Sequence, residues 1–390
     1  MIGMPYVLPR RISYNEGAAG ELLSLSEMYG ARSFLVLTDE VVKGTPAFIK
    51  LVNELEKNGV RVRVFSNIPR EPSIDVADEV VKFVNNDVPD LIVAVGGGSV
   101  IDVSKLVRVK ILRPDVKSED ISPFISLHIE NRKPILVAVP TTPGTGSDVS
   151  FAFVLKIREG DREVKYATGN YELVPYESIL DVEFLRTLPT RQLVITAIDG
   201  VAHSIEGLTS INSNPLSDGL AVQSLRMFFK YLPMALSGKD RDEALNNLHL
   251  AATISGMVIT NSGLGLVHAI AHPLGSIFNI PHGLAVAIVL PYVVEFNYED
   301  KAAKEKYDML KDILEKVDKF EERRDLKEHL LDLYSKVGQT THLRDIGISE
   351  EAYRSRIDDI VELALKDADL PFNPRPASYE DIKNILNKIY

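Results

Sequence analysis

The order of short apolar runs and longer amphipathic segments most strongly constrains how this 390-residue chain folds. Between residues 30 and 185, β-branched runs of strand length recur at 33–39, 60–66, 90–95 and 134–140. Segments with helical spacing separate these runs, and strands that alternate with helices form a parallel sheet. The sequence therefore predicts an N-terminal α/β domain with a parallel sheet.

Helical periodicity replaces this alternation in the second half of the chain. Apolar residues follow helical spacing in 220–236, 243–259 and 304–320. A capped helix is expected to start near Ser378, and the stretch 301–329 is interpreted as a solvated helical face. With the boundary placed in the loop 181–192, we expect two domains, an α/β domain (1–185) and an all-helical domain (186–390).

Charge and cysteine content exclude several classes of protein. The net charge of -11 argues against nucleic-acid or anionic-membrane binding, because both need clustered lysine and arginine. The sequence lacks an apolar run of about 18 residues and a recognisable N-terminal signal, so a cytoplasmic location without membrane partners is expected. Because the chain has no cysteine, nitrogen and oxygen donors must hold any metal.

One carboxylate and four histidines lie close together in the sequence and suggest such a metal site. Asp199 and His203 are four residues apart in a helical pattern, as are His268 and His272, and His282 follows in a Pro-His-Gly turn. A single pair is common by chance, and a lone buried histidine is most often a hydrogen-bonded core residue. Two pairs and a turn histidine favour Zn or Fe(II). Three or four ligands suffice, so the fifth residue has a supporting or catalytic role.

A glycine-rich turn follows the strand predicted at 90–95. Gly96, Gly97, Gly98 and Ser99 lead into a helix, and such a turn lets a phosphate approach the uncapped N–H groups at the helix start. Tight turns also use glycine for steric reasons alone. A second polar turn after the next strand, residues 141–148, offers hydroxyls at the same edge of the sheet and favours nucleotide binding.

Asp39 ends the first predicted strand and is placed to bind ribose hydroxyls and to repel a 2′-phosphate. This position suggests NAD rather than NADP. The standard dinucleotide fingerprint has its acid about 20 residues after the glycines, whereas Asp39 precedes them. The alternative is that Asp39 only caps a helix beginning near Val41.

The motifs GGGSVIDVSK, TTPGTGSD, AIDGVAHSIE and GLVHAIAHPLGSIFNIPHG occur in this order, and with them the chain resembles the iron-containing alcohol dehydrogenases. The resemblance spans nearly the whole chain and includes Glu71–Ser73, the segment around Lys165, 214–218 and 373–376. The chain departs from the family pattern at Asp148, usually glutamate, and at Val182, usually proline.

This resemblance implies a dehydroquinate-synthase-like fold, in which an α/β nucleotide domain precedes an all-helical metal and substrate domain. It implies four metal ligands, namely Asp199, His203, His268 and His282. His272 is then left as a non-ligand residue that relays a proton. The implied cofactor contacts are Asp39, Gly97, Gly98, Ser99, Asp102, Thr141, Thr142, Ser147 and Lys165.

The implied activity is hydride transfer between a small alcohol or aldehyde and NAD(P). A divalent metal acts as the Lewis acid, with Fe(II) favoured over Zn or Ni, and a homodimer is expected. A glycerol or glycerol-phosphate dehydrogenase is the nearest alternative. A non-redox lyase of the dehydroquinate synthase type is a second, but that enzyme pairs glutamate with two histidines. A nucleotide-binding protein without chemistry is a third, but no ligand position is lost.

Overall fold

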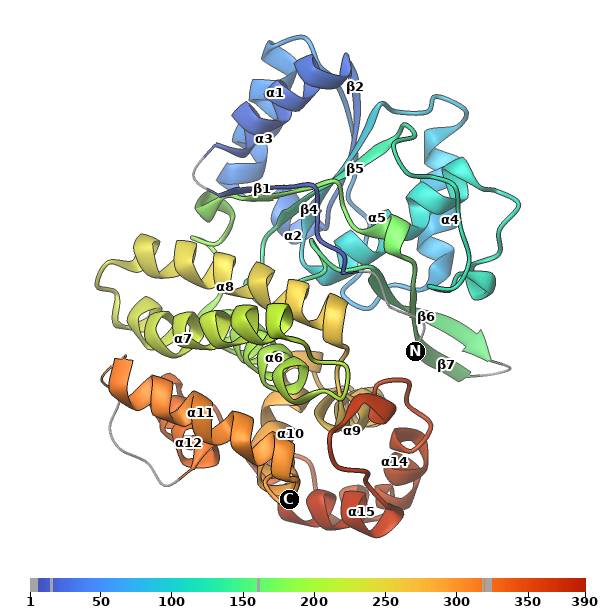
Figure 1. Cartoon of the computed structure of the whole chain (residues 1–390). Helices are drawn as coiled ribbons and strands as arrows, with labels where there is room; N and C mark the ends of the chain where they lie inside the picture. The colour runs from blue at the N-terminus through green and yellow to red at the C-terminus, as the bar shows by residue number, and fades with distance from the viewer. Residues whose placement is uncertain (1–5, 15–16, 160–161, 318, 320–324) are drawn as a thin grey trace. The chain divides into compact units, whose positions relative to one another are not determined.

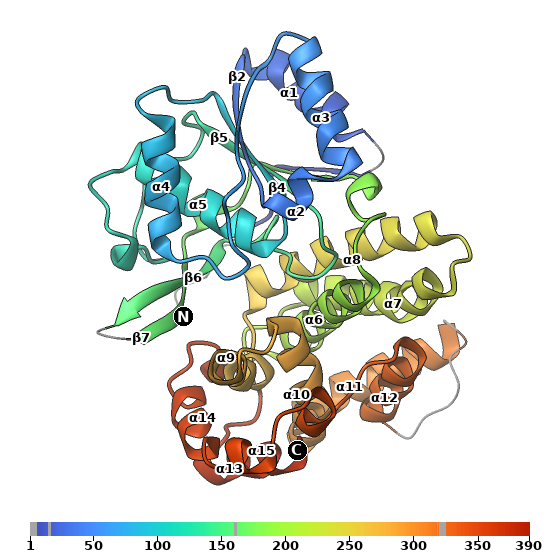
Figure 2. The same ribbon diagram turned by 180° about the vertical axis from the view of Figure 1, so that it is seen from behind.

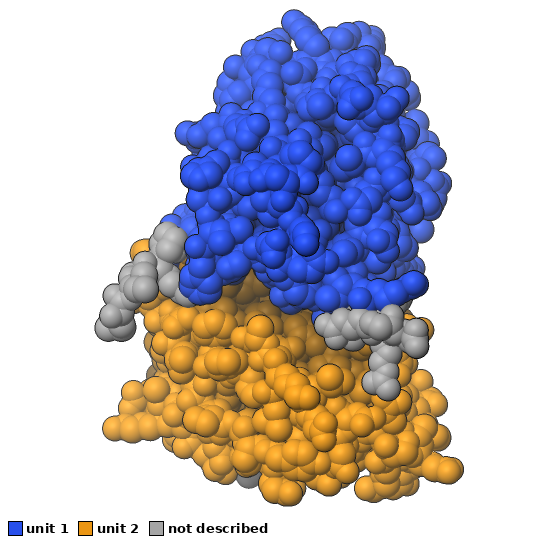
Figure 3. Space-filling model, turned by 90° about the vertical axis from the view of Figure 1, so that its right-hand side faces the viewer, with its two compact units in different colours: residues 1–189 blue, residues 190–390 orange. Residues whose placement is uncertain are grey.

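The computed structural model describes residues 6–14, 17–159, 162–317, 319 and 325–390. The chain divides into an N-terminal unit, Met1–Pro189, and a C-terminal unit, Thr190–Tyr390, which Figure 3 shows in different colours.

The N-terminal unit contains a parallel sheet and an antiparallel hairpin. Its strands are β1 (Arg11–Tyr14), β2 (Ser33–Leu37), β3 (Arg61–Phe65), β4 (Leu91–Gly96), β5 (Ile135–Pro140), β6 (Ala152–Glu159), β7 (Arg162–Gly169) and β8 (Glu177–Leu180). Six strands pair in parallel in the order β1-β8-β5-β4-β2-β3, and β6 pairs with β7. The predicted parallel sheet is confirmed, whereas strand β1 and the β6–β7 hairpin were not predicted.

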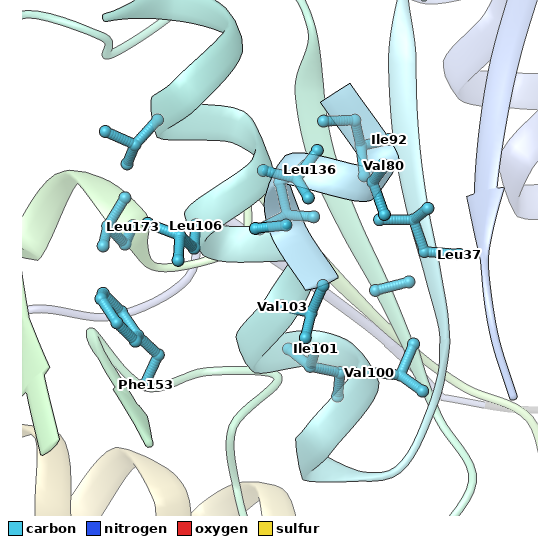
Figure 4. Close-up of a cluster of buried hydrophobic side chains, with 14 of the residues drawn as sticks. Leu37, Val80, Ile92, Val100, Ile101, Val103, Leu106, Leu136, Phe153 and Leu173 are labelled. Carbon is cyan, nitrogen blue, oxygen red and sulfur yellow. The ribbon is translucent and has the colours of Figure 1, made fainter. Parts of the chain in front are cut away.

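Helices cover both faces of this sheet (Figures 1 and 2). They are α1 (Ala18–Tyr29), α2 (Glu40–Lys43), α3 (Pro46–Lys57), α4 (Ile74–Val84) and α5 (Gly98–Leu112), with 3₁₀ turns η1 (Ser118–Asp120), η2 (Tyr171–Leu173) and η3 (Val182–Phe184). Helices α4 and α5 pack on one face and α1 and α3 on the other. Figure 4 shows the first of these cores.

Burial on both faces explains why the central strands read as continuous apolar runs. In β4, Ile92 and Ala94 pack toward α4 and α5, while Leu91 and Val93 pack toward α1 and α3. Strand β4 lies between β2 and β5, so the carboxyl ends of these three strands are adjacent. The turns that follow them therefore lie at one edge of the sheet.

The C-terminal unit is helical over its described residues. Its helices are α6 (Thr190–Thr209), α7 (Pro215–Ser237), α8 (Arg241–Ser262), α9 (Leu266–Phe278), α10 (His282–Asn297), α11 (Lys301–Val317), α12 (Leu326–Val337), α13 (Glu350–Arg354), α14 (Ile357–Ala364) and α15 (Tyr379–Lys388), with 3₁₀ turns η4 (Leu343–Ile346) and η5 (Leu370–Phe372). Helix α6 packs against α7, α8 and α10.

The expected helices are confirmed as α7, α8 and α11, although residues 318 and 320–324 of the segment 301–329 lie outside the described residues. Ser378 caps α15 with a capping box, as predicted. No single helix in the described ranges is long and apolar enough to cross a membrane. Helices α8 and α9 pass that length and composition test only as a pair bent by 107°.

Candidate functional site

Helix α6 carries two of the predicted metal ligands within the core of the C-terminal unit. Asp199 and His203 are one helical turn apart and are only 3% and 4% exposed. Every residue of α6 from Leu193 to Thr209 is buried, because the helix packs against three neighbours. Both side chains are therefore held away from bulk water.

Helices α9 and α10 bring the other histidines to α6. His268 lies in the first turn of α9, and His282 is the first residue of α10, after the N-cap Pro281. The expected Pro-His-Gly turn is thus the start of a helix. A Cβ at Gly283 would lie 2.4 Å from the backbone oxygen of Ile195, so glycine allows α10 to approach α6 closely.

Three imidazoles surround one carboxylate oxygen. Asp199 Oδ1 lies 3.6 Å from the Nε2 atoms of His268 and His282 and 3.7 Å from that of His203. Ligand atoms of Asp199, His268 and His282 all lie within 4.8 Å of one another. The His203 and His268 rings stack with their centroids 5.0 Å apart. The structure therefore brings all four predicted ligands together.

These separations fit ligands around a metal better than hydrogen-bonded pairs. Two donors about 2.1 Å from one cation are about 3.4 Å apart at a tetrahedral angle, whereas hydrogen bonds are shorter than 3.2 Å. Asp199 Oδ1 and His268 Nε2 are buried, and neither has a hydrogen-bond partner among the described residues. A cation of Zn or Fe(II) type would satisfy both atoms.

The electrostatics of the cluster also favour a cation. Burial raises the pKa of Asp199, but the imidazoles of His203, His282 and His268 outweigh it and leave that pKa well below its usual range. Burial lowers the pKa of His268, but the carboxylates of Glu206 and Asp199 raise it well above its usual value. An environment that attracts a proton to His268 Nε2 attracts a metal ion in the same way.

His272 lies beside this cluster and has a partner of its own. Its ring stacks on His282 at 5.3 Å and meets His268 edge-on at 5.9 Å between centroids. His272 Nδ1 donates to Asp367 Oδ2 at 2.8 Å, which leaves Nε2 as the acceptor nitrogen of the neutral ring. Asp369 is also close, and burial raises its pKa to about 6.

In the N-terminal unit, the glycine turn (Gly96–Ser99) packs against the polar turn (141–148). Added Cβ atoms at Gly97 and Gly98 would lie 3.4 Å from Thr142 Oγ1 and 3.1 Å from Thr145 Cγ2. The amide of Thr141 donates to the Gly96 carbonyl at 3.1 Å. Helix α5 begins at this contact with no side-chain cap, as an anion site requires.

The other predicted cofactor residues have protein partners. Asp39 is the N-cap of α2, and its Oδ1 accepts from the amides of Val41 and Val42 at 2.8 Å. Asp39 therefore has the helix-capping role that the sequence suggested as the alternative. The other carboxylate oxygen, Oδ2, accepts neither of these two hydrogen bonds. Ser99 Oγ donates to the Arg70 carbonyl. Asp102 and Ser147 hydrogen-bond each other in the interior.

Lys165 on β7 lies directly opposite Lys156 on β6. Glu71 sits between these like charges, with its Oε1 3.4 Å from Lys165 Nζ and its Oε2 2.9 Å from Lys156 Nζ. The chain segment around Glu71 is thereby held next to the hairpin. The sequence motif at 71–73 and the Lys165 segment are neighbours in space.

Two family models match the chain, "Iron-containing alcohol dehydrogenase" over residues 9–182 and "Fe-containing alcohol dehydrogenase family, C-terminal" over residues 193–390. The chain is 33% identical to an alcohol dehydrogenase of Thermococcus barophilus, with 99% of both chains covered. It is 32% identical to an NADPH-dependent butanol dehydrogenase of Clostridium saccharobutylicum, with 99% and 98% covered. The iron-containing alcohol dehydrogenase of Thermococcus thioreducens superposes with a TM-score of 0.88 at 32% identity over 99% of both chains.

The chain belongs to the iron-containing alcohol dehydrogenase family. It is therefore an oxidoreductase that acts on alcohols or aldehydes with a divalent metal and NAD(P). The predicted enzyme class and fold class are confirmed. Full-length matches to redox enzymes favour this activity over the lyase and over a protein without chemistry.

Sequence reasoning missed two acidic positions of this dehydrogenase. Glu206 accepts a hydrogen bond from His268 Nδ1 and another from the Val267 amide at 2.7 Å. A carboxylate that binds the far nitrogen of a metal-ligating histidine fixes its ring and tautomer. Glu206 lies on the same face of α6 as Asp199 and His203, so its spacing was a usable signal. No comparable signal marks Asp367, which is 95 residues from its partner His272.

Proposed function

We propose that four side chains hold Fe(II), in preference to Zn or Ni: Asp199, His203, His268 and His282. The observation that carries this proposal is the buried Asp199 Oδ1, which has three imidazole Nε2 atoms within 3.7 Å. With three nitrogens and one oxygen as protein ligands, a substrate oxygen would be a fifth ligand, to which catalytic sites can expand. The family description supports iron over other metals that accept the same donors.

When bound, the metal supplies a Lewis acid for the alcohol oxygen, and the nicotinamide takes up the carbinol hydride. Glu206 fixes the His268 ring through Nδ1, so that Nε2 faces Asp199. We propose that His272 receives the alcohol proton through Nε2. Its support is the Asp367 carboxylate, which accepts from Nδ1 and stabilises the protonated ring that results.

We also propose that the N-terminal domain binds NAD in preference to NADP. The expected contacts are Asp39, Gly97, Gly98, Ser99, Asp102, Thr141, Thr142, Ser147 and Lys165. The adjacent glycine and polar turns support this, because both lie at the carboxyl edge of the sheet. The half-buried Asp39 carboxylate at the end of β2 supports selection against a 2′-phosphate. The expected homodimer, cytoplasmic location and domain limits at 185/186 stay predictions.

Anaerobic purification, metal analysis and assays at 340 nm test the proposed function. Short alcohols, diols and glycerol would be oxidised with NAD or NADP. Metal-dependent formation of reduced cofactor is expected, and the best alcohol identifies the substrate class. Binding of metal and NAD without any absorbance change, for every alcohol and aldehyde, would instead favour the lyase.

The variant His268→Ala tests the ligand set. We expect loss of bound metal and a fall in turnover of more than about 100-fold, because one ligand and its link to Glu206 are removed. His342→Ala is the matched control, since His342 is a half-buried histidine that bonds Tyr292 at 3.3 Å. Normal metal content in His268→Ala would remove His268 from the ligand set.

A further inference from the structure

Lys105 is a fully buried lysine near the proposed nucleotide site. It lies on α5 and is 0% exposed. Its Nζ donates to Ser147 Oγ at 2.9 Å, to Ser150 Oγ at 3.1 Å and to the Ala152 carbonyl at 2.5 Å. An ammonium has three N–H groups, so each of them has an acceptor.

Asp102 completes this buried network from the same helix. Its Oδ1 accepts from Ser147 Oγ and lies 3.7 Å from Lys105 Nζ. Its Oδ2 accepts from the Val154 amide at 2.9 Å. Helix α5 thus holds the chain from Ser147 to Val154, which connects the polar turn to β6.

The stability of the fold does not explain a lysine at this position. Burying an ammonium is costly, and apolar residues of similar size often replace buried ion pairs without loss of stability. Burial lowers the pKa of Lys105 to about 8, although Asp102 and Asp148 oppose this shift. The three acceptors around Nζ fit a protonated side chain.

We infer that Lys105 is a positioning residue for dinucleotide binding, which fixes the polar turn against the glycine turn. The inference rests on the proposed function. Lys105 holds Ser147 near the end of the polar turn, while Thr142 and Thr145, earlier in the same turn, lie next to Gly97 and Gly98. Without the ammonium, Ser147 and Ser150 lose their common donor. The polar turn then populates several conformations, and NAD(H) must select one of them.

The test is NADH binding by the full-length protein, measured from the fluorescence of NADH itself, since the chain has no tryptophan. Lys105→Met keeps the length of the side chain but removes the donors. We expect the Kd for NADH to rise at least about tenfold, as for one lost charged hydrogen bond, with a similar rise in the KM for NAD. The kcat at saturating NAD is expected to change little. The thermal midpoint is expected to fall by a few degrees, because Asp102 loses a buried partner.

Lys110→Met is the control, because Lys110 lies on the same helix and pairs with Asp78 at 2.7 Å, away from both turns. A Kd for Lys105→Met within about twofold of the control would overturn the inference. A thermal midpoint of Lys105→Met more than about 10 °C below that of the control would also overturn the inference, because it would indicate a purely structural role. If Lys105→Met does not fold, Ser150→Ala serves as the test variant instead. An unchanged Kd for NADH in Ser150→Ala would then overturn the inference. Absence of NADH binding by the wild-type chain would instead overturn the proposed function.

Discussion

At the scale of single residues, the same side-chain type has different roles because its neighbours differ. His268 and His272 are one turn apart on α9, yet His268 Nδ1 faces Glu206 and His272 Nδ1 faces Asp367. The first ring is 1% exposed beside Asp199, and the second is 15% exposed. Both rings have a carboxylate at Nδ1, so the Asp199 oxygen beside Nε2 and the deeper burial of His268 distinguish the proposed ligand from the proposed proton acceptor.

Replacing His272 separates these two roles. In His272→Ala we expect the kcat to fall by about 100-fold or more at neutral pH, since a positioned base is lost. Metal content should stay normal, because His272 is outside the ligand set. The measurement is kcat against pH together with metal analysis. Full turnover across the pH range would show that His272 has no catalytic role.

Replacing Asp39 tests cofactor choice. Asp39→Gly removes the charge that disfavours a 2′-phosphate, so the ratio of kcat/KM for NAD to that for NADP should fall by about tenfold or more. The helix cap on α2 is lost as well, at a cost of about 1 kcal/mol. Asp39→Asn is the control, because it keeps a capping oxygen without the charge. An unchanged ratio in both variants would leave Asp39 as a helix cap only.

At the scale of elements, close contact between helices brings the proposed metal ligands together. His282 begins α10, and the next residue, Gly283, touches the backbone of α6 at Ile195. The distance from His282 Nε2 to Asp199 Oδ1 thus depends on how closely α10 approaches α6. A side chain at residue 283 would separate the two helices.

The variant Gly283→Ala should therefore weaken metal binding without removing a ligand. Its Cβ would lie 2.4 Å from the Ile195 oxygen, and we expect a loss of stability of about 1–3 kcal/mol together with reduced metal retention against a weak chelator. Gly219→Ala is the control, since a Cβ there meets no atom within 4 Å. Equal metal retention and equal stability in the two variants would contradict this account of the α6–α10 contact.

At the scale of the whole molecule, each unit carries one part of the proposed chemistry. The proposed metal ligands all lie between Thr190 and Tyr390, and the proposed cofactor contacts all lie before Pro189. Family models match both parts, over residues 9–182 and 193–390. The proposal therefore places metal binding and nucleotide binding in separate parts of the chain.

Metal removal should destabilise the C-terminal unit more than the N-terminal unit. A free metal concentration 100 times the Kd stabilises the folded state by about 2.7 kcal/mol, which chelation would abolish. Hydrogen exchange with and without chelator should show lost protection in α6, α9 and α10, because these helices carry the ligands. Peptides from β2, β4 and β5 should change little and serve as the internal control. Unchanged exchange in α6 would indicate that no metal binds there.

The sequence was sufficient to predict the elements that depend on local pattern. Apolar runs such as 90–95 predicted the parallel strands, here β4 (Leu91–Gly96), and helical spacing placed Asp199 and His203 on one face. The sequence was not sufficient to predict the β6–β7 hairpin, because the alternation of apolar and polar residues in these strands was not recognised. The motif resemblance supplied the family, which the comparisons confirm, and a ligand set that stays a prediction.

Sequence by itself thus determined the fold class and which residues share a helix face, because helical and strand periodicity are local properties. The enzyme class came from the motif resemblance. Only the tertiary structure decided which of these faces meet. Gly283 against Ile195 brings His282 to Asp199, and packing brings Asp367 to His272 across 95 residues. Contacts between distant segments depend on how helices pack, and no spacing within one segment encodes them.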